Sequence, residues 1–233
     1  MSLLEIHKLS AFYGDFQALF DIDLYAEQGE TVAIIGANGS GKSTFLQSIA
    51  GGVPVKKESV AFAGKPMGGT PAWDVVSTGI ALVPEGRRLF ASLTVEENLL
   101  MGAYAAPKGN WTLEKVFGLF PKLEQRRSQA AFTLSGGEQQ MVAIGRALMS
   151  NPKLLMCDEL SLGLAPIIIG QIYSTLSKVK EYGMTLLLVE QDIRQAMAVS
   201  DRLYCFQAGK VSLEGRPSEL NQDQISRAYF GVS

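Results

Sequence analysis

Two apolar segments of this sequence end abruptly in polar side chains. LLMCDE runs from Leu154 to Glu159, and LLLVEQD runs from Leu186 to Asp192. In an open α/β sheet, ligands bind beyond the carboxyl ends of the strands, so polar groups at these ends are placed for chemistry. Neighbouring carboxylates can hold a magnesium ion and activate a water molecule. The two endings are therefore expected to belong to one site.

A glycine-rich segment suggests the substrate of that site. GANGSGKST matches the phosphate-binding pattern G-x-x-x-x-G-K-[ST] and stands between a predicted strand and a predicted helix, which argues against a chance glycine loop. Its backbone N–H groups and the positive end of the helix are expected to cradle phosphates. Lys42 should reach the β- and γ-phosphates of a nucleotide, and Ser43 should ligate Mg²⁺. The predicted nucleotide-binding residues are Gly36, Ala37, Asn38, Gly39, Ser40, Gly41, Lys42, Ser43 and Thr44.

The two acids at the end of LLMCDE complete such a site. Asp158 is predicted to hold Mg²⁺, directly or through water, as an Asp that ends an apolar strand beside the strand of the phosphate loop. Glu159 would then face the γ-phosphate and orient or deprotonate a water, a role typically worth ~10²–10⁴ in rate. The alternative is that both acids merely cap the following turn.

The pattern of apolar residues predicts alternating strands and helices. Strands are expected over residues 3–9, 18–26, 31–36, 60–64, 80–85, 153–159, 184–190, 201–207 and 210–215. Helices are expected at 42–50, within 94–128, and at 137–150, 166–183, 192–199 and 221–230. Thr94 and Glu97 form a capping-box signal at the start of the helical block. Alternation interrupted by one helical block predicts a mainly parallel sheet with a helical insertion.

Composition limits the kinds of partner. The net charge is −2 and no long run of Lys and Arg occurs, so a nucleic-acid partner is not expected. No apolar run approaches the roughly 18 residues that cross a bilayer, and the first residues lack a secretion signal. Cys157 and Cys205 fall in predicted buried strands, where free thiols fit a reducing cytoplasm. The composition indicates a cytosolic protein that can still dock on a membrane protein.

A third motif, TLSGGEQQ, precedes a predicted helix and supplies a second helix N-terminus suited to anions. The order of phosphate loop, LSGGEQQ and strand-Asp-Glu resembles the ATP-binding cassette (ABC) ATPases over essentially the whole chain. The resemblance implies that two ATPase domains stack head to tail around two ATP molecules, hydrolyse them and separate. In that arrangement the signature motif of each domain completes the other domain's site. The signature residues would be Ser135, Gly136, Gly137 and Glu138.

The resemblance also implies the fold. Residues 1–233 would form a single ABC ATPase domain of the α/β class, with a RecA-like P-loop NTPase core and an antiparallel β subdomain. Residues 1–85 and 141–233 would form this ATP-binding part. Residues 86–140 would form an α-helical subdomain that carries the signature motif, which gives the domain an L shape.

Three further positions match functional residues of the family. Tyr13 matches the aromatic residue that stacks on adenine, although a loop tyrosine packed against the sheet is the alternative. Glu85 stands where the family has a Gln that contacts Mg²⁺, and its carboxylate can still ligate the ion. Gln191 stands where the family has a histidine that senses the γ-phosphate. An amide can donate a hydrogen bond to a phosphate oxygen or to the attacking water, but it cannot become a cation. Glu159 is thus the predicted acid–base residue, and Gln191 the residue that positions the reactants.

Four neighbouring residues have a less direct expected role. Leu160 replaces the usual Pro after the Asp-Glu pair, which could loosen the turn, and Ala165 replaces an Asp of the loop that crosses the dimer interface. Glu190 and Asp192 are expected to orient the turn and the next helix rather than to contact substrate.

The segment ALVPEGRRLFASLTVEENLLMGAY resembles most closely the ATPase subunits of branched-chain amino acid importers. Importers of urea and short-chain amides use very similar subunits, so those cargoes are alternatives. A non-transport ABC ATPase that works on DNA or ribosomes is a further alternative, but this chain has no room for the second ATPase domain or coiled coil typical of that class. A subunit that binds ATP without hydrolysing it is the last alternative.

Family resemblance also implies partners. The chain would lie at the cytoplasmic face of the inner membrane as a peripheral subunit, docked on separate membrane permease subunits. Residues 86–140 would receive a permease helix, and Arg87, Arg88, Leu89 and Phe90 at the entrance are candidate contacts. The alternative is a solvated arginine pair beside a Phe that packs in the core. A second ATPase subunit, identical or not, and an extracytoplasmic solute-binding protein would complete the system.

Overall fold

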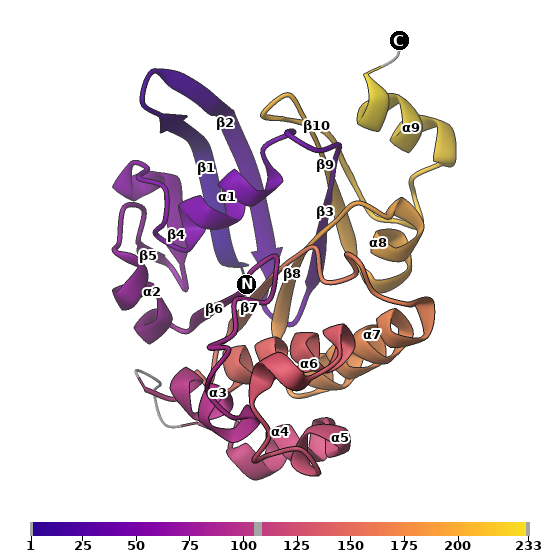
Figure 1. Cartoon of the computed structure of the whole chain (residues 1–233). Helices are drawn as coiled ribbons and strands as arrows, with labels where there is room; N and C mark the ends of the chain where they lie inside the picture. The colour runs from indigo at the N-terminus through magenta and orange to yellow at the C-terminus, as the bar shows by residue number, and fades with distance from the viewer. Residues whose placement is uncertain (1, 105–108, 232–233) are drawn as a thin grey trace.

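The computed structural model describes residues 2–104 and 109–231, and a six-stranded sheet forms its centre (Figure 1). The strand order is β10-β9-β3-β8-β7-β6, and all neighbours run parallel except the β9–β10 pair. The strands are β3 (Thr31–Ile35), β6 (Ile80–Val83), β7 (Leu154–Asp158), β8 (Thr185–Glu190), β9 (Arg202–Gln207) and β10 (Lys210–Gly215). The predicted mainly parallel sheet is confirmed.

An antiparallel sheet of order β2-β1-β4-β5 forms one side of the molecule, together with two helices. Its strands are β1 (Ser2–Tyr13), β2 (Phe16–Glu27), β4 (Val60–Phe62) and β5 (Lys65–Pro66), and the helices are α1 (Lys42–Ile49) and α2 (Ala72–Thr78). The hairpin β1–β2 extends beyond the predicted strands because the register continues to Tyr13 opposite Phe16. Helix α2 was not predicted, because it lies in a stretch rich in Gly and Pro. Pro71 precedes it and Gly79, with φ of 102°, ends it.

The remaining helices cover the other side of the central sheet. Figure 1 shows α3 to α7 gathered on one side, with α9 beside β9 and β10, while α8 contacts β3 and β8. They are α3 (Val95–Gly102), α4 (Leu113–Leu119), α5 (Pro121–Glu124), α6 (Gly136–Leu148), α7 (Pro166–Glu181), α8 (Ile193–Val199) and α9 (Gln222–Phe230). Short 3₁₀ turns occur at Lys57–Ser59 and Ala131–Thr133. The predicted capping box of Thr94 and Glu97 is present.

The boundaries of the helical subdomain stay a prediction. Helices α3, α4 and α5 lie within residues 86–140, as expected for that subdomain. Helix α6, however, begins at Gly136 and runs to Leu148, so it crosses the predicted boundary between residues 140 and 141. Any division of the chain there cuts a continuous helix.

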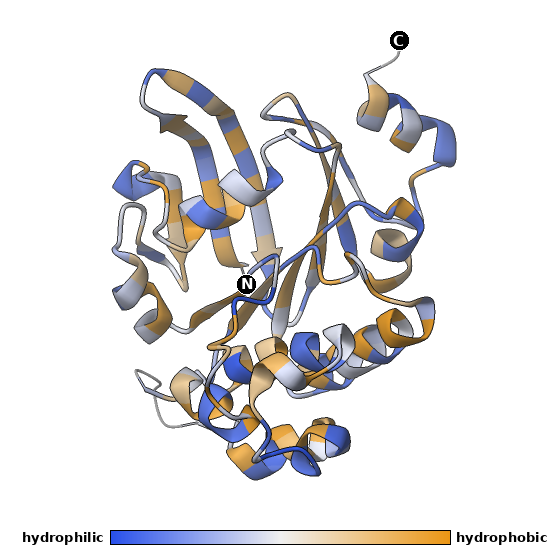
Figure 2. Ribbon diagram, viewed as in Figure 1, coloured by the Kyte–Doolittle hydropathy of each residue, from blue (hydrophilic) through white to orange (hydrophobic). Residues whose placement is uncertain are grey.

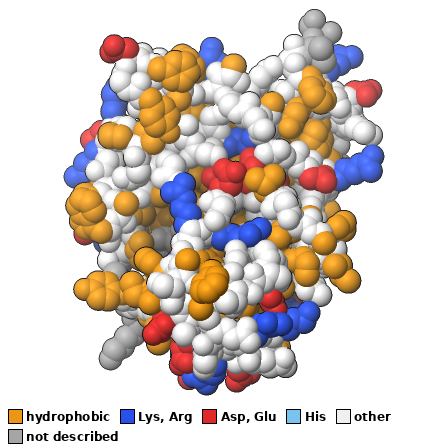
Figure 3. Space-filling view, viewed as in Figure 1, with side chains coloured by type: hydrophobic (Ala, Val, Ile, Leu, Met, Phe, Trp, Pro, Cys, Tyr) orange, Lys and Arg blue, Asp and Glu red, His pale blue; other side chains and the backbone are white. Residues whose placement is uncertain are grey.

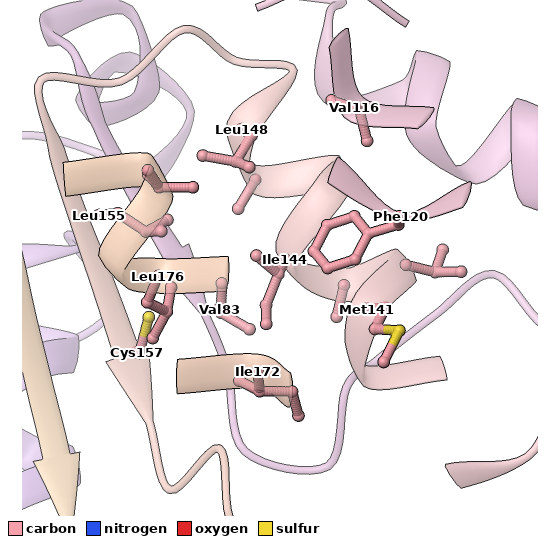
Figure 4. Packing of buried hydrophobic residues seen from close by; sticks show 14 of the residues in the cluster. Val83, Val116, Phe120, Met141, Ile144, Leu148, Leu155, Cys157, Ile172 and Leu176 are labelled. Atoms are coloured by element: carbon pink, nitrogen blue, oxygen red, sulfur yellow. The ribbon is translucent and has the colours of Figure 1, made fainter. Parts of the chain in front are cut away.

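Two large apolar clusters fix the central sheet between its neighbours. On one face, side chains of alternate strand residues pack against α1 and the antiparallel sheet. On the other face, Val83, Leu155 and Cys157 lie against Ile144 and Leu148 of α6 (Figure 4). The hydropathy colours of Figure 2 follow this arrangement, with apolar strands inside and polar surfaces on the helices. Strands buried on both faces present only their ends to a ligand, which places the site there.

One further sequence expectation agrees with the structure. Cys157 and Cys205 are both buried and free, as predicted. None of the helices in the described part of the chain is both long enough and apolar enough to cross a bilayer.

Candidate nucleotide-binding site

A cleft of about 910 Å³ lies at the carboxyl ends of the central strands and is bounded by the β1–β2 hairpin. Most of the predicted site residues line it: Tyr13, Asn38, Gly39, Gly41, Lys42, Ser43, Thr44, Glu85, Glu159 and Gln191. Segments that are separated by more than a hundred residues in the sequence therefore meet in one cavity. The two strand endings with which the sequence analysis began face the same space.

The backbone of the phosphate loop depends on its glycines. Gly36 has φ of 156°, and a Cβ there would lie 2.4 Å from the Phe206 carbonyl oxygen and 2.5 Å from Ser40 Oγ. Gly41, with φ of 104°, has Leu19 Cδ2 at 2.6 Å from the position of a Cβ. Ser40 Oγ is buried and has no hydrogen-bond partner. The loop is thus held close to its neighbours, and its N–H groups are free of side chains that would cover them.

Lys42 points into the loop instead of into solvent. Its Nζ donates hydrogen bonds to the carbonyl oxygens of Gly36, at 2.7 Å, and Ala37, at 3.2 Å. It also lies 3.7 Å from Glu159 Oε1, and only 4% of its side chain is exposed. The site therefore contains a fixed, poorly solvated positive charge, which suits a phosphate group.

Asp158 lies beneath the cleft, at the end of β7. The prediction that its strand lies beside β3, the strand of the phosphate loop, was wrong, because β8 lies between β3 and β7. The two motifs still meet, because the first turn of α1 reaches across and Ser43 Oγ donates to Asp158 Oδ1 at 3.4 Å. Burial, together with the charges of Glu159 and Glu85, raises the pKa of Asp158 to about 6, although the hydrogen bond from Ser43 opposes the shift.

These oxygen ligands suit a magnesium ion. Ser43, Asp158 and Glu85 supply one hydroxyl and two carboxylates, and the crowded negative charge that raises the pKa of Asp158 would be neutralised by a cation. Within residues 2–104 and 109–231, no group of three or more His, Cys, Asp or Glu side chains forms a metal site. Mg²⁺ does not need one, because it takes one or two carboxylates and fills its other positions with phosphate oxygens and water.

Glu159 and Gln191 are in direct contact. Gln191 Nε2 donates a hydrogen bond to Glu159 Oε2 at 2.6 Å, while the other carboxylate oxygen faces Lys42. The sequence analysis expected Gln191 to donate to a phosphate oxygen or to the attacking water, whereas here its amide holds the carboxylate. Glu159 itself has φ of 47°, a conformation that residues other than glycine seldom adopt. Its side chain is therefore held in place by the backbone and by Gln191 together.

Tyr13 lies at the tip of the β1–β2 hairpin, where its side chain is 53% exposed. Its hydroxyl donates to Thr44 Oγ1 at 3.4 Å, so the ring stands beside the phosphate loop. This position excludes the alternative of a tyrosine packed against the sheet. An exposed ring at the mouth of the cleft can stack on a flat base.

Sequence reasoning missed part of the cleft wall. Phe16 pairs with Tyr13 across the hairpin and is 70% exposed, so it offers a second ring on the same side. The clue was the repeated aromatic residues of AFYGDFQALF, which alternate too irregularly for one buried face. The other residues that sequence reasoning missed are Gln17, Ala18, Phe20, Leu162, Ala208 and Gly209.

The signature residues are not part of this cleft. Ser135 is the N-cap of α6, and its Oγ is 2.7 Å from Glu138 Oε2 in a capping box. Glu138 also pairs with Arg126 at 2.9 Å. A Cβ on Gly137 would lie 2.6 Å from Ile168 Cγ2, so this glycine lets α6 approach α7. None of residues 135–138 lines the cleft, so the chain does not bring its own signature to its own phosphate loop.

The four residues with a less direct expected role lie outside the cleft lining. Leu160 is 1% exposed and belongs to the apolar cluster of α6 and α7, so the leucine anchors this turn. Ala165 is the exposed residue before α7. Asp192 caps α8 by accepting from the Gln195 N–H at 3.1 Å, as expected of a residue that orients the helix. Glu190 is buried.

Comparison with known proteins agrees with this geometry. A family model described as ABC transporter matches residues 19–161. The chain is 45% identical to the high-affinity branched-chain amino acid transport ATP-binding protein BraG of Pseudomonas aeruginosa, over 98% of this chain and 100% of that protein. A crystal structure of the ADP conformation of an ATP-binding cassette of an ABC transporter has a TM-score of 0.82 and 30% identity, over 97% of this chain and 94% of that one.

A second solved structure is similar over 92% of this chain and 98% of its own, with a TM-score of 0.80 and 26% identity. It is a dimeric, post-hydrolysis state of an ATP-binding cassette bound to ADP and Pi. The phosphate loop, the strand order and these similarities agree. The chain has the ABC ATPase fold and belongs to the ABC transporter family of ATP-binding proteins.

Proposed function

We propose that this chain is the ATP-hydrolysing subunit of an ABC importer that drives uptake of branched-chain amino acids through separate permease subunits. The observation that carries the proposal is the contact of Lys42, Glu159 and Gln191 in one cleft. The similarity to BraG over nearly the whole of both chains supports the cargo.

The cleft can perform the binding steps. The N–H groups of the phosphate loop and Lys42 would bind the phosphates of ATP, and Tyr13 would stack on the base. Ser43, Asp158 and Glu85 would hold Mg²⁺, which neutralises charge on the phosphates when it is bound. Because Lys42 already lies within the loop, it would exchange its carbonyl partners for phosphate oxygens without leaving the site.

Glu159 is the residue suited to accept a proton from the attacking water. It is a carboxylate at the edge of the cleft, and the hydrogen bond from Gln191 fixes its orientation. A positioned general base of this kind typically contributes about 10²–10⁴ in rate. The Gln191 amide does not act as an acid or a base. Its contribution would therefore be to keep the Glu159 carboxylate directed at the water.

A second ATPase subunit is part of the proposal. The signature residues of α6 lie outside the chain's own cleft, and their helix N-terminus is therefore available to a nucleotide held by another chain. The similar dimeric cassette bound to ADP and Pi supports this arrangement. The partner could be a copy of this chain or a related subunit.

Docking on a permease would use the helical block of residues 86–140, with Arg87, Arg88, Leu89 and Phe90 at its entrance. Arg88 also borders the region between α1, α2 and β6. A cavity of about 300 Å³ there is lined mainly by apolar side chains, with Arg88 at its edge. Phe90 and Trp73 nearby in the sequence are 47% and 75% exposed. Figure 3 shows exposed hydrophobic side chains in several separate patches on the face drawn. Arg87 and Leu89 are only partly exposed, and Arg87 contacts Gln139 at 3.3 Å. The chain would then lie at the cytoplasmic face of the membrane, below the permeases and an extracytoplasmic solute-binding protein.

The test is ATP turnover of the assembled transporter in lipid vesicles, with leucine, valine and urea offered as cargo. Glu159→Gln should slow turnover about 10²–10⁴-fold while ATP affinity stays nearly unchanged. Gln191→Ala should also slow turnover more than it weakens ATP binding. Equal turnover of the wild type and Glu159→Gln would contradict the catalytic assignment. Uptake of urea but not of leucine would overturn the cargo.

A further inference from the structure

Glu190 is a buried acid that the proposed hydrolysis does not use. It ends β8 and is 1% exposed, yet it directly precedes Gln191. One of its oxygens accepts a hydrogen bond from Ser161 Oγ at 2.7 Å, and the other accepts one from the Tyr173 hydroxyl. The carboxylate therefore joins three segments: the end of β8, the loop after Glu159, and helix α7.

Burying this carboxylate costs free energy. No Lys, Arg or His in the described part of the chain forms an ion pair with it. Burial raises the pKa of Glu190, the charges of Glu159 and Asp192 act in the same direction, and the two hydroxyl donors oppose the shift. An apolar side chain at such a position is often at least as favourable for stability. A carboxylate here calls for a role other than stability.

The contacts of Glu190 enclose the catalytic pair. The Glu159 N–H donates to the Val189 carbonyl at 2.9 Å, and two residues later Ser161 donates to Glu190. The loop is thus attached to the end of β8 at two successive points. Gln191 directly follows β8, and its side-chain amide donates a hydrogen bond to Glu159. These contacts form a closed ring, and Glu159 and Gln191 are the members of the ring that face the cleft.

This ring explains how Glu159 keeps its conformation. With φ of 47°, the residue occupies a region that is unfavourable for side chains with a Cβ. Such a conformation persists only where the surroundings over-determine it. The Val189 carbonyl and the Ser161–Glu190 contact are the two restraints on either side of it. Tyr173, on α7, holds the other oxygen of Glu190 and so prevents the carboxylate from turning away.

We propose that Glu190 is a positioning residue for ATP hydrolysis: through Ser161 and Tyr173 it holds the loop after β7 against the end of β8, so that Glu159 meets Gln191. The inference rests on the proposed function, because the turnover of ATP is what the arrangement serves. The inference predicts that loss of these hydrogen bonds reduces kcat. Nucleotide affinity should stay almost unchanged, since none of the three residues lines the nucleotide cleft.

The experiment removes single hydroxyl groups from the full-length chain. Ser161→Ala and Tyr173→Phe each delete one donor to Glu190. Tyr204→Phe is the matched control, because Tyr204 is also a buried tyrosine whose hydroxyl donates to a glutamate, Glu214, at 3.0 Å, outside the cleft. For each variant, kcat, the Kd for ATP and the melting temperature are measured with Mg²⁺ and ATP.

Ser161→Ala and Tyr173→Phe should lower kcat about tenfold, because small misplacements of catalytic groups have effects of this order or larger. The Kd for ATP should change less than about twofold, since affinity depends on other groups. Tyr204→Phe should lower the melting temperature as much as Tyr173→Phe does, with kcat unchanged. Glu190→Gln, whose amide can exchange hydrogen bonds with both hydroxyls, should retain most of the kcat that Glu190→Ala loses.

Two kinetic outcomes would overturn the inference. One is a normal kcat for both Ser161→Ala and Tyr173→Phe. The other is a fall in kcat that Tyr204→Phe shares, because the residues would then act only through stability.

A second measurement separates this inference from the proposed function. Hydrogen exchange of the segment 159–164 should become faster in Ser161→Ala and Tyr173→Phe and stay unchanged in Tyr204→Phe. A wild type that binds ATP without hydrolysing it would contradict the proposed function, and the exchange result would still decide the positioning role. Unchanged exchange in all three variants would contradict that role.

Discussion

The chain contains two helices that begin in glycine-rich motifs, and their first turns differ. Helix α1 follows the phosphate loop: Gly41 stands at its N-cap, no side chain caps it, and its first turn carries no acid. Helix α6 follows the signature motif: Ser135 caps it, and Glu138 in its first turn accepts from the Ser135 backbone N–H at 2.9 Å. The first turn of α6 therefore carries its own carboxylate at the positive end of the helix, and the first turn of α1 does not.

This difference teaches that a glycine-rich helix N-terminus is not a phosphate site by itself. The loop before α1 adds further N–H groups, and Lys42, the first residue of α1, adds a positive charge, so that a phosphate can be bound within one chain. At α6, Glu138 competes with any incoming anion, and Arg126 in turn neutralises Glu138. By itself α6 therefore forms no complete phosphate site, and under the proposed function it would act on a nucleotide presented by another chain. The proposed head-to-tail pairing supplies one.

The glycines of the two motifs should respond differently to a methyl group, which is the largest effect we expect. Gly36→Ala should destabilise the fold by about 3 kcal/mol, because the new Cβ would meet the backbone oxygen of Phe206. Gly137→Ala should cost less, about 1–2 kcal/mol, since its Cβ would meet only side-chain atoms of Ile168, with Cγ2 at 2.6 Å, and alanine favours the helix. Urea unfolding measures both. A similar cost at both positions would remove the structural distinction between the two motifs.

The acids near the two helices should also respond to pH in opposite directions. The pKa of Asp158 in the fold is about 6, above its ordinary 3.8. The stabilisation by its proton is therefore complete below pH 3.8 and is lost as the pH rises through about 6. Asp158→Asn should accordingly unfold with about 1–2 kcal/mol more free energy than the wild type at pH 8, after allowance for solvent screening, and with the same free energy at pH 4. A variant less stable at pH 8 would refute this.

Glu138 should show the reverse dependence. Its partial burial tends to raise its pKa, but the hydrogen bonds from Ser135 and the charge of Arg126 outweigh this and hold the pKa below its ordinary 4.5. The stabilisation is thus present above pH 4.5 and is lost as the pH falls through the lowered value. Glu138→Gln should cost about 0.5–1 kcal/mol at pH 7, the value of a helix cap, and less at pH 3. An equal cost at both values would show that the charge of Glu138 is not involved.

Much of the site could be predicted from the sequence because its parts are local. The phosphate loop, the Asp-Glu pair and the glutamine at the end of β8 are each carried by a short motif next to a buried strand. Tyr13 was found only through the family resemblance, and its place in the cleft agrees with it. Such features need no knowledge of which strands are neighbours.

The features that sequence reasoning missed depend on contacts between distant segments. The strand order, with β8 between β3 and β7, depends on how distant segments pack together. No short sequence motif predicts this order. The same is true of the hydrogen bond from Gln191 to Glu159 and of the ring of contacts around Glu190. Helix α2 was missed for another reason: its local sequence has the Gly and Pro content of a loop, and its apolar contacts stabilise it.

The central claim is that one chain holds one complete phosphate site, at α1, and one incomplete site, at α6. The most direct measurement is a calorimetric titration of the isolated chain with ATP and Mg²⁺. Lys42→Ala should weaken binding about 100-fold, the effect of losing a charged hydrogen-bond donor, whereas Ser135→Ala should change it less than about twofold. Unchanged affinity in Lys42→Ala, or an equal loss in Ser135→Ala, would contradict the account.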